Sequence, residues 1–106
     1  MIIDMRLQPK PFERIKSGLK KIELRIHDEK RRALKVGDGI VFRKRPDEVE
    51  ELSVRITDLL VYPSFSDLLG YADEDRDWAK ESLGTYYTPE EEKEWGVVGI
   101  CIELNN

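Results

Sequence analysis

The chain has 106 residues, of which 40% are apolar and 38% are charged, and its formal net charge at pH 7 is -4. This length suits one domain with a single hydrophobic core, and the apolar share argues against a disordered chain. No apolar run is long enough to span a bilayer, which excludes a membrane-spanning helix.

Cys101 is the single cysteine and His27 the single histidine. One cysteine cannot form an internal disulfide, which suits a reducing compartment, and one residue of each kind argues against a structural zinc site. The first residues, Met-Ile-Ile-Asp-Met-Arg, lack the basic start and small-residue cleavage site of a signal peptide. We therefore expect a cytoplasmic protein without a metal or other cofactor.

The first elements are a strand and a helix. Alternation of apolar and polar residues predicts a half-buried strand whose inward residues are Ile3, Met5 and Leu7. A short helix follows, opened by Pro9 and Pro11 and stopped at Ser17-Gly18. Its expected core-facing residues, spaced three and four apart, are Phe12, Ile15 and Leu19.

A second alternating segment predicts a strand from Lys20 to Ile26 with two different faces. The apolar face consists of Ile22, Leu24 and Ile26. The polar face consists of Lys21, Glu23 and Arg25. Residues 27–34 predict a turn or a single helical turn, and the turn at 36–39 leads into a strand from Ile40 to about Arg43.

The second half of the chain predicts two more strands with helices between them. After a loop at 45–48, the longest strand runs from Glu51 to Tyr62 and is ended by Pro63. Its residues of one parity are Leu52, Val54, Ile56, Leu60 and Tyr62. From Phe65 to Leu83 the apolar period is helical, and the acidic run 73–77 is expected to separate two short helices.

A capped helix and a closing strand complete the pattern. Thr88, Pro89 and Glu91 combine an N-cap, a first-turn proline and a capping-box glutamate. The last strand runs from Val97 to Leu104, with Val98, Ile100, Ile102 and Leu104 inward. Five strands separated by short helices predict one α+β domain, residues 1–106, built on a small, mostly antiparallel β-barrel.

Positive charge is concentrated in the first half of the chain. Residues 10–45 hold 13 Lys/Arg against five Asp/Glu, whereas residues 46–106 hold four against sixteen. These charges either mix on the folded surface or form a basic face for phosphates. The acidic total disfavours a sequence-blind nucleic-acid coat, but a focused site for a nucleotide or a short RNA is compatible with it.

The main candidate site has the pattern G-x-K-x-x-E-x-R, formed by Gly18, Lys20, Glu23 and Arg25. On a strand, Glu23 and Arg25 share a face about 7 Å apart, and Lys20 joins them only if the chain bends near Gly18. Arginine and lysine bind phosphate or carbonyl oxygens, and a carboxylate orients them or accepts a hydrogen bond from a base amino group. The alternative is a surface Glu-Arg pair of little energetic value.

Other candidate residues each have a structural alternative. Tyr86 and Tyr87 could stack on a base or donate a hydroxyl, or they could simply cover the end of the barrel. His27 has no obvious partner and is expected to be a solvated turn residue. Cys101 lacks neighbouring cations and is expected to be an inert thiol.

The octapeptide Gly-Leu-Lys-Lys-Ile-Glu-Leu-Arg at 18–25, the Val-Gly-Asp turn at 36–38 and the segment 87–100 together resemble the ASCH domain of the PUA-like superfamily. The resemblance covers nearly the whole chain and implies a PUA-like barrel with the motif residues lining a cleft. Members of this family are widely regarded as RNA-associated, which implies RNA or a nucleotide-like molecule as partner. The expected binding residues are Gly18, Lys20, Glu23, Arg25, Tyr86 and Tyr87.

Two alternatives remain open. A small ASCH group of similar size resembles this chain and acts as an amidohydrolase on modified cytidine through lysine, threonine and glutamate, and other members resemble ribonucleases. Lys20 matches the lysine of that group, but Glu23 replaces the threonine, which removes the nucleophile. We therefore assign no catalytic residue. The other alternative is a protein-interaction domain that works through its acidic second half.

Overall fold

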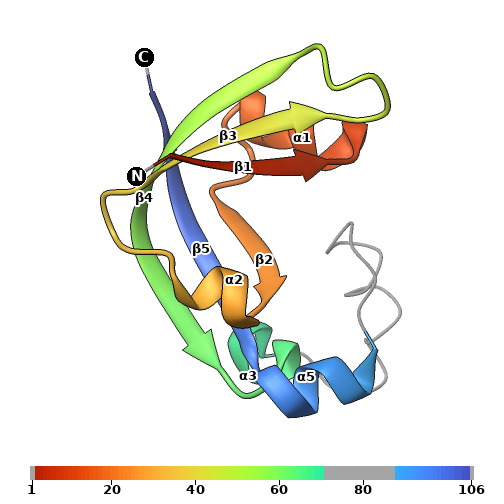
Figure 1. Ribbon diagram of the computed structural model, residues 1–106, viewed down its shortest axis with the longest axis vertical. Coiled ribbons are helices and arrows are strands. Elements are labelled where there is room, and N and C mark those ends of the chain that lie inside the picture. The colour runs from red at the N-terminus through yellow and green to blue at the C-terminus, as the bar shows by residue number, and fades with distance from the viewer. Residues whose placement is uncertain (1, 71–87, 106) are drawn as a thin grey trace.

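The computed structural model describes residues 2–70 and 88–105, and within them five strands and four short helices follow one another (Figure 1). In chain order they are β1 (Ile2–Leu7), α1 (Pro9–Lys16), β2 (Ile22–Ile26), α2 (Glu29–Arg32), β3 (Gly39–Lys44), β4 (Glu51–Tyr62), α3 (Phe65–Leu69), α5 (Pro89–Trp95) and β5 (Val97–Leu104). All five predicted strands are confirmed. The second helix expected before Leu83, with the acidic run 73–77, lies outside the described residues.

The strands form one sheet in the order β1-β3-β4-β5-β2. The β1-β3 pair is parallel, and the three other pairs are antiparallel. The sheet curls into a half-barrel, so its two edge strands, β1 and β2, lie on either side of the concave face (Figure 1). The predicted α+β class with a mostly antiparallel barrel is confirmed.

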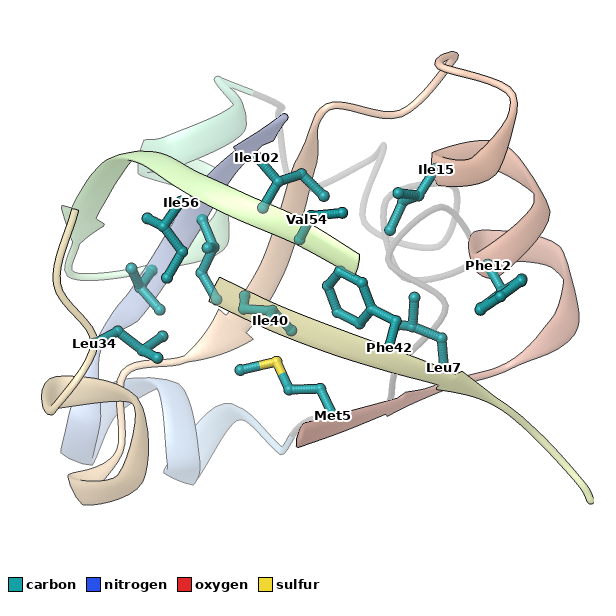
Figure 2. Close-up of a cluster of buried hydrophobic side chains, with 12 residues drawn as sticks. Met5, Leu7, Phe12, Ile15, Leu34, Ile40, Phe42, Val54, Ile56 and Ile102 are labelled. Atoms are coloured by element: carbon teal, nitrogen blue, oxygen red, sulfur yellow. The ribbon is translucent and has the colours of Figure 1, made fainter. Parts of the chain in front are cut away.

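The main core fills the concave side of this sheet. Figure 2 shows Phe12 and Ile15 of α1 packing beside side chains of the strands, with Leu34 at the opposite end. Its buried members are Met5, Leu7, Phe12, Ile15, Leu34, Ile40, Phe42, Val54, Ile56, Val98, Ile100 and Ile102. Burying each such side chain contributes about 1.5–3 kcal/mol, so this cluster fixes the framework on which β2 is held.

A second, smaller cluster covers the other side of β2. Leu24 and Ile26 pack there with Phe65 of α3 and Val97 of β5, and with the partly buried Leu68 and Trp95. Gly99 allows this close packing, since a Cβ at that position would lie 3.3 Å from a methyl group of Leu68. The apolar face of β2 is therefore buried against α3 and not in the main core.

The polar face of β2 consequently points to the main core. In the antiparallel register with β5, Glu23 is opposite Ile100 and Arg25 is opposite Val98. Paired residues of neighbouring strands extend to the same face of a sheet, and both of these β5 residues belong to the main core. The alternation within β2 was predicted correctly, but the polar face is the buried interior of the half-barrel.

Two expectations about core-facing residues are wrong. Leu19 is exposed, because α1 ends at Lys16 and Gly18, with φ +83°, turns the chain away before the next helical position. In β4 the pairing with β5 shifts between Ile56 and Asp58, so the bulge changes the parity of the strand. Leu59 packs on the main core after the bulge, so Leu60 does not share the face of Val54 and Ile56 as its parity predicted.

The helix before β5 is capped as predicted. The Thr88 hydroxyl accepts a hydrogen bond from the backbone N–H of Glu91, and the Glu91 carboxylate accepts one from the backbone N–H of Thr88. This reciprocal pair satisfies two helix-end donors and sets the start of α5. After α5 and Gly96 the chain enters β5, the strand with which β2 pairs.

Candidate functional site

The turn between α1 and β2 decides where Lys20 points. The Arg14 carbonyl accepts hydrogen bonds from the backbone N–H groups of Leu19 and Lys20 at 3.0 Å each, and from the Ser17 hydroxyl at 3.0 Å. Gly18 supplies the left-handed conformation that closes the helix. The chain therefore bends before β2 begins, which lets Lys20 reach residues of the strand despite its opposite parity.

Lys20, Glu23 and Arg25 form one cluster, referred to below as the triad. The Lys20 Nζ lies 3.2 Å from Glu23 Oε1, and an Arg25 Nη lies 3.5 Å from Glu23 Oε2. The Glu23 Oε1 atom also accepts a hydrogen bond from the backbone N–H of Leu24 at 3.0 Å. One carboxylate thus lies between two cations, and the triad has a net charge of +1.

Burial within the triad is uneven. The Glu23 side chain is 1% exposed, whereas 14% of Lys20 and 10% of Arg25 remain exposed. A charge moved out of water without partners is very costly, so Glu23 depends on its two cations and on the Leu24 amide. The two cations are therefore the partly exposed members of the triad, and the carboxylate is its buried member.

Arg25 also connects the two edges of the sheet. Its guanidinium donates a hydrogen bond of 3.1 Å to the backbone carbonyl of Arg6. Arg6 belongs to β1 and Arg25 to β2, the two edge strands of the described sheet. Arg25 therefore bridges the two edges of the concave face. It stabilises the curled sheet through this hydrogen bond and pairs with the Glu23 carboxylate through its charge.

Two polar atoms of the triad have no hydrogen-bond partner among the described residues. They are Glu23 Oε2 and Arg25 Nε, and both are buried. Buried polar atoms in folded proteins nearly always have a partner, so exceptions mark places where ligands or ordered waters bind. The same holds for Arg31 Nε, which lies outside the triad, so these atoms leave room for a water or ligand partner without setting the triad apart.

Two hollows meet at Lys20 and Lys21. One, of about 420 Å³, is lined by these lysines and Gly18, with Thr57 among the residues of its far wall. The other, of about 580 Å³, is lined by Arg14, Leu19, Lys20, Lys21 and Ile22. Of the predicted site residues that the structure describes, Gly18 and Lys20 line these hollows, whereas Glu23 and Arg25 line neither of the two.

Residues 5–105 match the family model of the ASCH domain. The chain belongs to the ASCH domain family. Members of this family are generally regarded as RNA-binding modules.

Solved structures show the same relationship. The chain is 37% identical to the hypothetical protein PH0355, with a TM-score of 0.79 over 99% of this chain and 100% of that one. It is 35% identical to PF0455 from Pyrococcus furiosus, with a TM-score of 0.66 over 98% and 97% of the two chains. No curated protein matches the chain.

A more distant structure supports the fold alone. The S128A mutant of ZmASCH from Zymomonas mobilis is 12% identical, with a TM-score of 0.54 over 94% of this chain and 66% of that one. At this identity the similarity shows that the two chains share a fold. It transfers no residue role to the triad.

The remaining candidates of this ASCH domain lie apart from the triad or outside the described residues. Tyr86 and Tyr87 lie outside them. His27 follows β2 and is half-buried; burial, and next the charge of Arg32, lower its pKa, while Asp28 opposes them. Burial, with the Asp58 carboxylate, raises the pKa of the half-buried Cys101 thiol, which keeps it protonated at neutral pH.

Sequence reasoning missed the other residues around the ASCH triad. Arg14, Leu19 and Lys21 line the 580 Å³ hollow with Lys20, and the Arg6 carbonyl receives Arg25. The one sequence signal for the hollow was the stop at Ser17-Gly18, which implies that Leu19 leaves the helix. The hydrogen bond between Arg25 and the Arg6 carbonyl forms because the curled sheet brings β1 close to β2, and a local sequence pattern cannot predict that curvature.

Metal and membrane sites find no support in the described parts of this ASCH domain. In residues 2–70 and 88–105, no group of three or more His, Cys, Asp or Glu side chains is placed to hold a metal ion. The helices in those ranges are all too short or too polar to cross a membrane.

Proposed function

We propose that this ASCH domain binds RNA or a nucleotide-like ligand through the triad and the basic surface around Lys20. The observation that carries the proposal is the arrangement of charge: one buried carboxylate lies between two cations whose side chains are 14% and 10% exposed, so the triad has a net positive charge close to the surface. Such a group attracts phosphate and carbonyl oxygens, because both are acceptors for the lysine and arginine donors.

The surroundings of Lys20 strengthen this reading. Arg14 and Lys21 line the 580 Å³ hollow with Lys20, and none of the described residues that line it is acidic. Three cations close together raise the local concentration of an anionic ligand and speed its binding. The net acidic charge of the chain then limits binding elsewhere on the surface, which favours one focused site.

Glu23 acts as a positioning residue in this proposal. Its carboxylate fixes Lys20 through Oε1 and faces Arg25 through Oε2, so that neither long side chain needs to be ordered when the ligand arrives. Preorganised donors bind more tightly because less side-chain entropy is lost on binding. Since Glu23 is buried, a direct contact between its carboxylate and a base is not part of the proposal.

The test is RNA binding by variants of the full chain, measured by fluorescence anisotropy with a short single-stranded RNA. Lys20→Gln removes one phosphate-binding charge and keeps a side chain of similar length, so we expect affinity to fall on the order of tenfold. Lys93→Gln, on the far side in α5, is the matched control and should bind as the unmodified protein does. Arg25→Ala should also weaken binding by more than Lys93→Ala, with folding checked by circular dichroism.

Salt dependence provides an independent check. A phosphate contact releases counterions, so the logarithm of the affinity should fall linearly with the logarithm of the salt concentration. Lys20→Gln should make this slope shallower by about 0.7, the contribution of one contact to a single strand. Binding that does not depend on salt, or equal losses for Lys20→Gln and Lys93→Gln, would contradict a phosphate-led site.

A further inference from the structure

We infer that the turn between α1 and β2, residues 17–21, contacts single-stranded RNA by placing Leu19 against exposed bases while Arg14 and Lys21 hold the flanking phosphates. This inference rests on the proposed function and extends it from the triad to the outer surface of the same turn. Lys20 joins the two parts, since it belongs to the triad and also lines the hollow beside Leu19.

The first observation is the exposure of Leu19 on an ordered turn. This leucine is 84% exposed, although the turn that carries it is held by three hydrogen bonds to the Arg14 carbonyl. A large apolar side chain held in water by an ordered backbone gains nothing for folding. It can gain on binding, because a partner that covers it removes apolar surface from water at little cost in backbone entropy.

The second observation is the set of residues around Leu19. Ile22, at 40% exposure, lies with Leu19 in the wall of the 580 Å³ hollow, and the other lining residues are Arg14, Lys20 and Lys21. Apolar surface surrounded by cations is complementary to a ligand that carries both an apolar ring and a negative charge.

A comparison with Val49 shows that exposure alone does not define the surface. Val49 is 79% exposed in the connection between β3 and β4, but its neighbours Glu48 and Glu50 are acidic and are bound to Arg6 and Lys16. The carboxylates of that loop face their own cations, so Val49 lacks the purely basic surroundings of Leu19. Leu19 combines similar exposure with the opposite charge, which makes Val49 a matched control.

The chemistry favours a single strand over a duplex. Apolar side chains contact bases only where the bases are unstacked, at loops, bulges, ends or single strands. In a single strand, bases and phosphates lie close together, as do the apolar Leu19 and Ile22 and the two lysines between them. A duplex would offer its phosphates to the three cations and leave Leu19 without a partner.

The experiment compares Leu19→Ser with Val49→Ser in the full chain, using a short uridine-rich single strand and a duplex of the same length in anisotropy titrations. Leu19→Ser should weaken binding to the single strand on the order of tenfold and leave duplex binding unchanged. Val49→Ser should change neither. Because Leu19 and Val49 both face solvent, the variants are expected to fold, and thermal unfolding of each provides the check.

The outcomes separate this inference from the proposed function. If Lys20→Gln weakens binding while Leu19→Ser binds normally, the turn contact is wrong and the triad site stands. If the unmodified protein binds neither RNA, the proposed function and the turn contact are both wrong. If Leu19→Ser loses duplex binding as strongly as single-strand binding, the preference for single strands is wrong.

A lipid surface is the remaining occupant to test, since an exposed leucine among cations also suits an anionic bilayer. Cosedimentation with vesicles of phosphatidylcholine and phosphatidylserine measures this directly. We expect no binding to these vesicles. Vesicle binding that Leu19→Ser abolishes, together with unchanged RNA binding by that variant, would assign the turn to a membrane and overturn the inference.

Discussion

Two groups of ion pairs in this ASCH domain use the same chemistry in opposite environments. The triad lies inside the half-barrel, with its carboxylate 1% exposed. The second group, here called the hairpin network, joins α1 to the β3-β4 connection across the surface. Its pairs are Lys16–Glu50 at 2.6 Å, Lys44–Glu13 at 2.7 Å and Lys44–Glu50 at 3.6 Å.

The difference shows that distance is a poor guide to the importance of an ion pair. The two shortest pairs of the hairpin network are closer than any pair of the triad, yet water and salt screen them. The triad has longer contacts, but removing Glu23 leaves two largely buried cations without their common partner. Environment, and not geometry alone, determines what each group contributes.

The largest expected effect is loss of the buried carboxylate. Glu23→Ala should lower the free energy of unfolding by about 3–5 kcal/mol, because two partly buried cations lose their common partner. Glu50→Ala in the hairpin network is the matched control and should change stability little. Urea unfolding followed by circular dichroism measures both, and equal effects of the two variants would show that burial does not separate the two groups.

An intermediate effect is expected for Arg25→Lys, which keeps the charge and removes the guanidinium fork. The lysine can still face Glu23, but it cannot also supply the hydrogen bond to the Arg6 carbonyl. An unmet buried hydrogen bond costs about 1–3 kcal/mol, so the loss should be smaller than for Glu23→Ala. Hydrogen exchange should also become faster in β1, the strand that receives this bond, and unchanged exchange there would contradict the bridge between the sheet edges.

A smaller effect is expected from salt, which should change the contribution of the hairpin network to stability but not that of the triad. At about 1 M salt the Debye length is about 3 Å, so exposed charges are screened and buried ones are not. Any destabilisation by Lys44→Ala should therefore disappear when unfolding is repeated at high salt, whereas the destabilisation by Glu23→Ala should persist. Loss of both effects at high salt would mean that the triad is solvated in solution.

Local patterns were sufficient to predict the elements but not the position of the triad. Period-2 alternation located four of the strands, the turn at 36–39 located the strand that follows it, and Thr88 with Glu91 located the start of α5. These signals are local, because strand faces, turns and helix caps depend on near neighbours in the chain. The same alternation placed Glu23 and Arg25 on one face. It could not show that this face is the interior, since that depends on α3 covering the opposite face.

The errors have equally local causes. The spacing of Leu19 in the sequence fits the helical period of α1, but Gly18, in the left-handed conformation, ends the helix before Leu19. Leu60 continued the strand period, but the bulge after Ile56 reversed the faces. Both features insert or turn a residue within one element, and a period read from sequence carries across such a break unless the break is recognised.

The smallest expected effect concerns His27, which belongs to neither group of ion pairs. It is half-buried beside Arg32 and Asp28, and burial, followed by the Arg32 charge, lowers its pKa from the ordinary 6.5. Because the folded-state pKa is depressed, the folded protein holds its proton less tightly than the unfolded chain does. The resulting stabilisation is present above pH 6.5 and is lost as the pH falls through the folded pKa.

His27 is the single histidine of the chain, so its imidazole signal can be followed by NMR without assignment of other histidines. We expect a midpoint below 6.5 and two variants that move it in opposite directions. Arg32→Gln removes a neighbouring cation and should raise the pKa, whereas Asp28→Asn removes a carboxylate and should lower it further. A midpoint at or above the ordinary value would mean that His27 is solvated, and shifts of both variants in the same direction would mean that these charges do not control it.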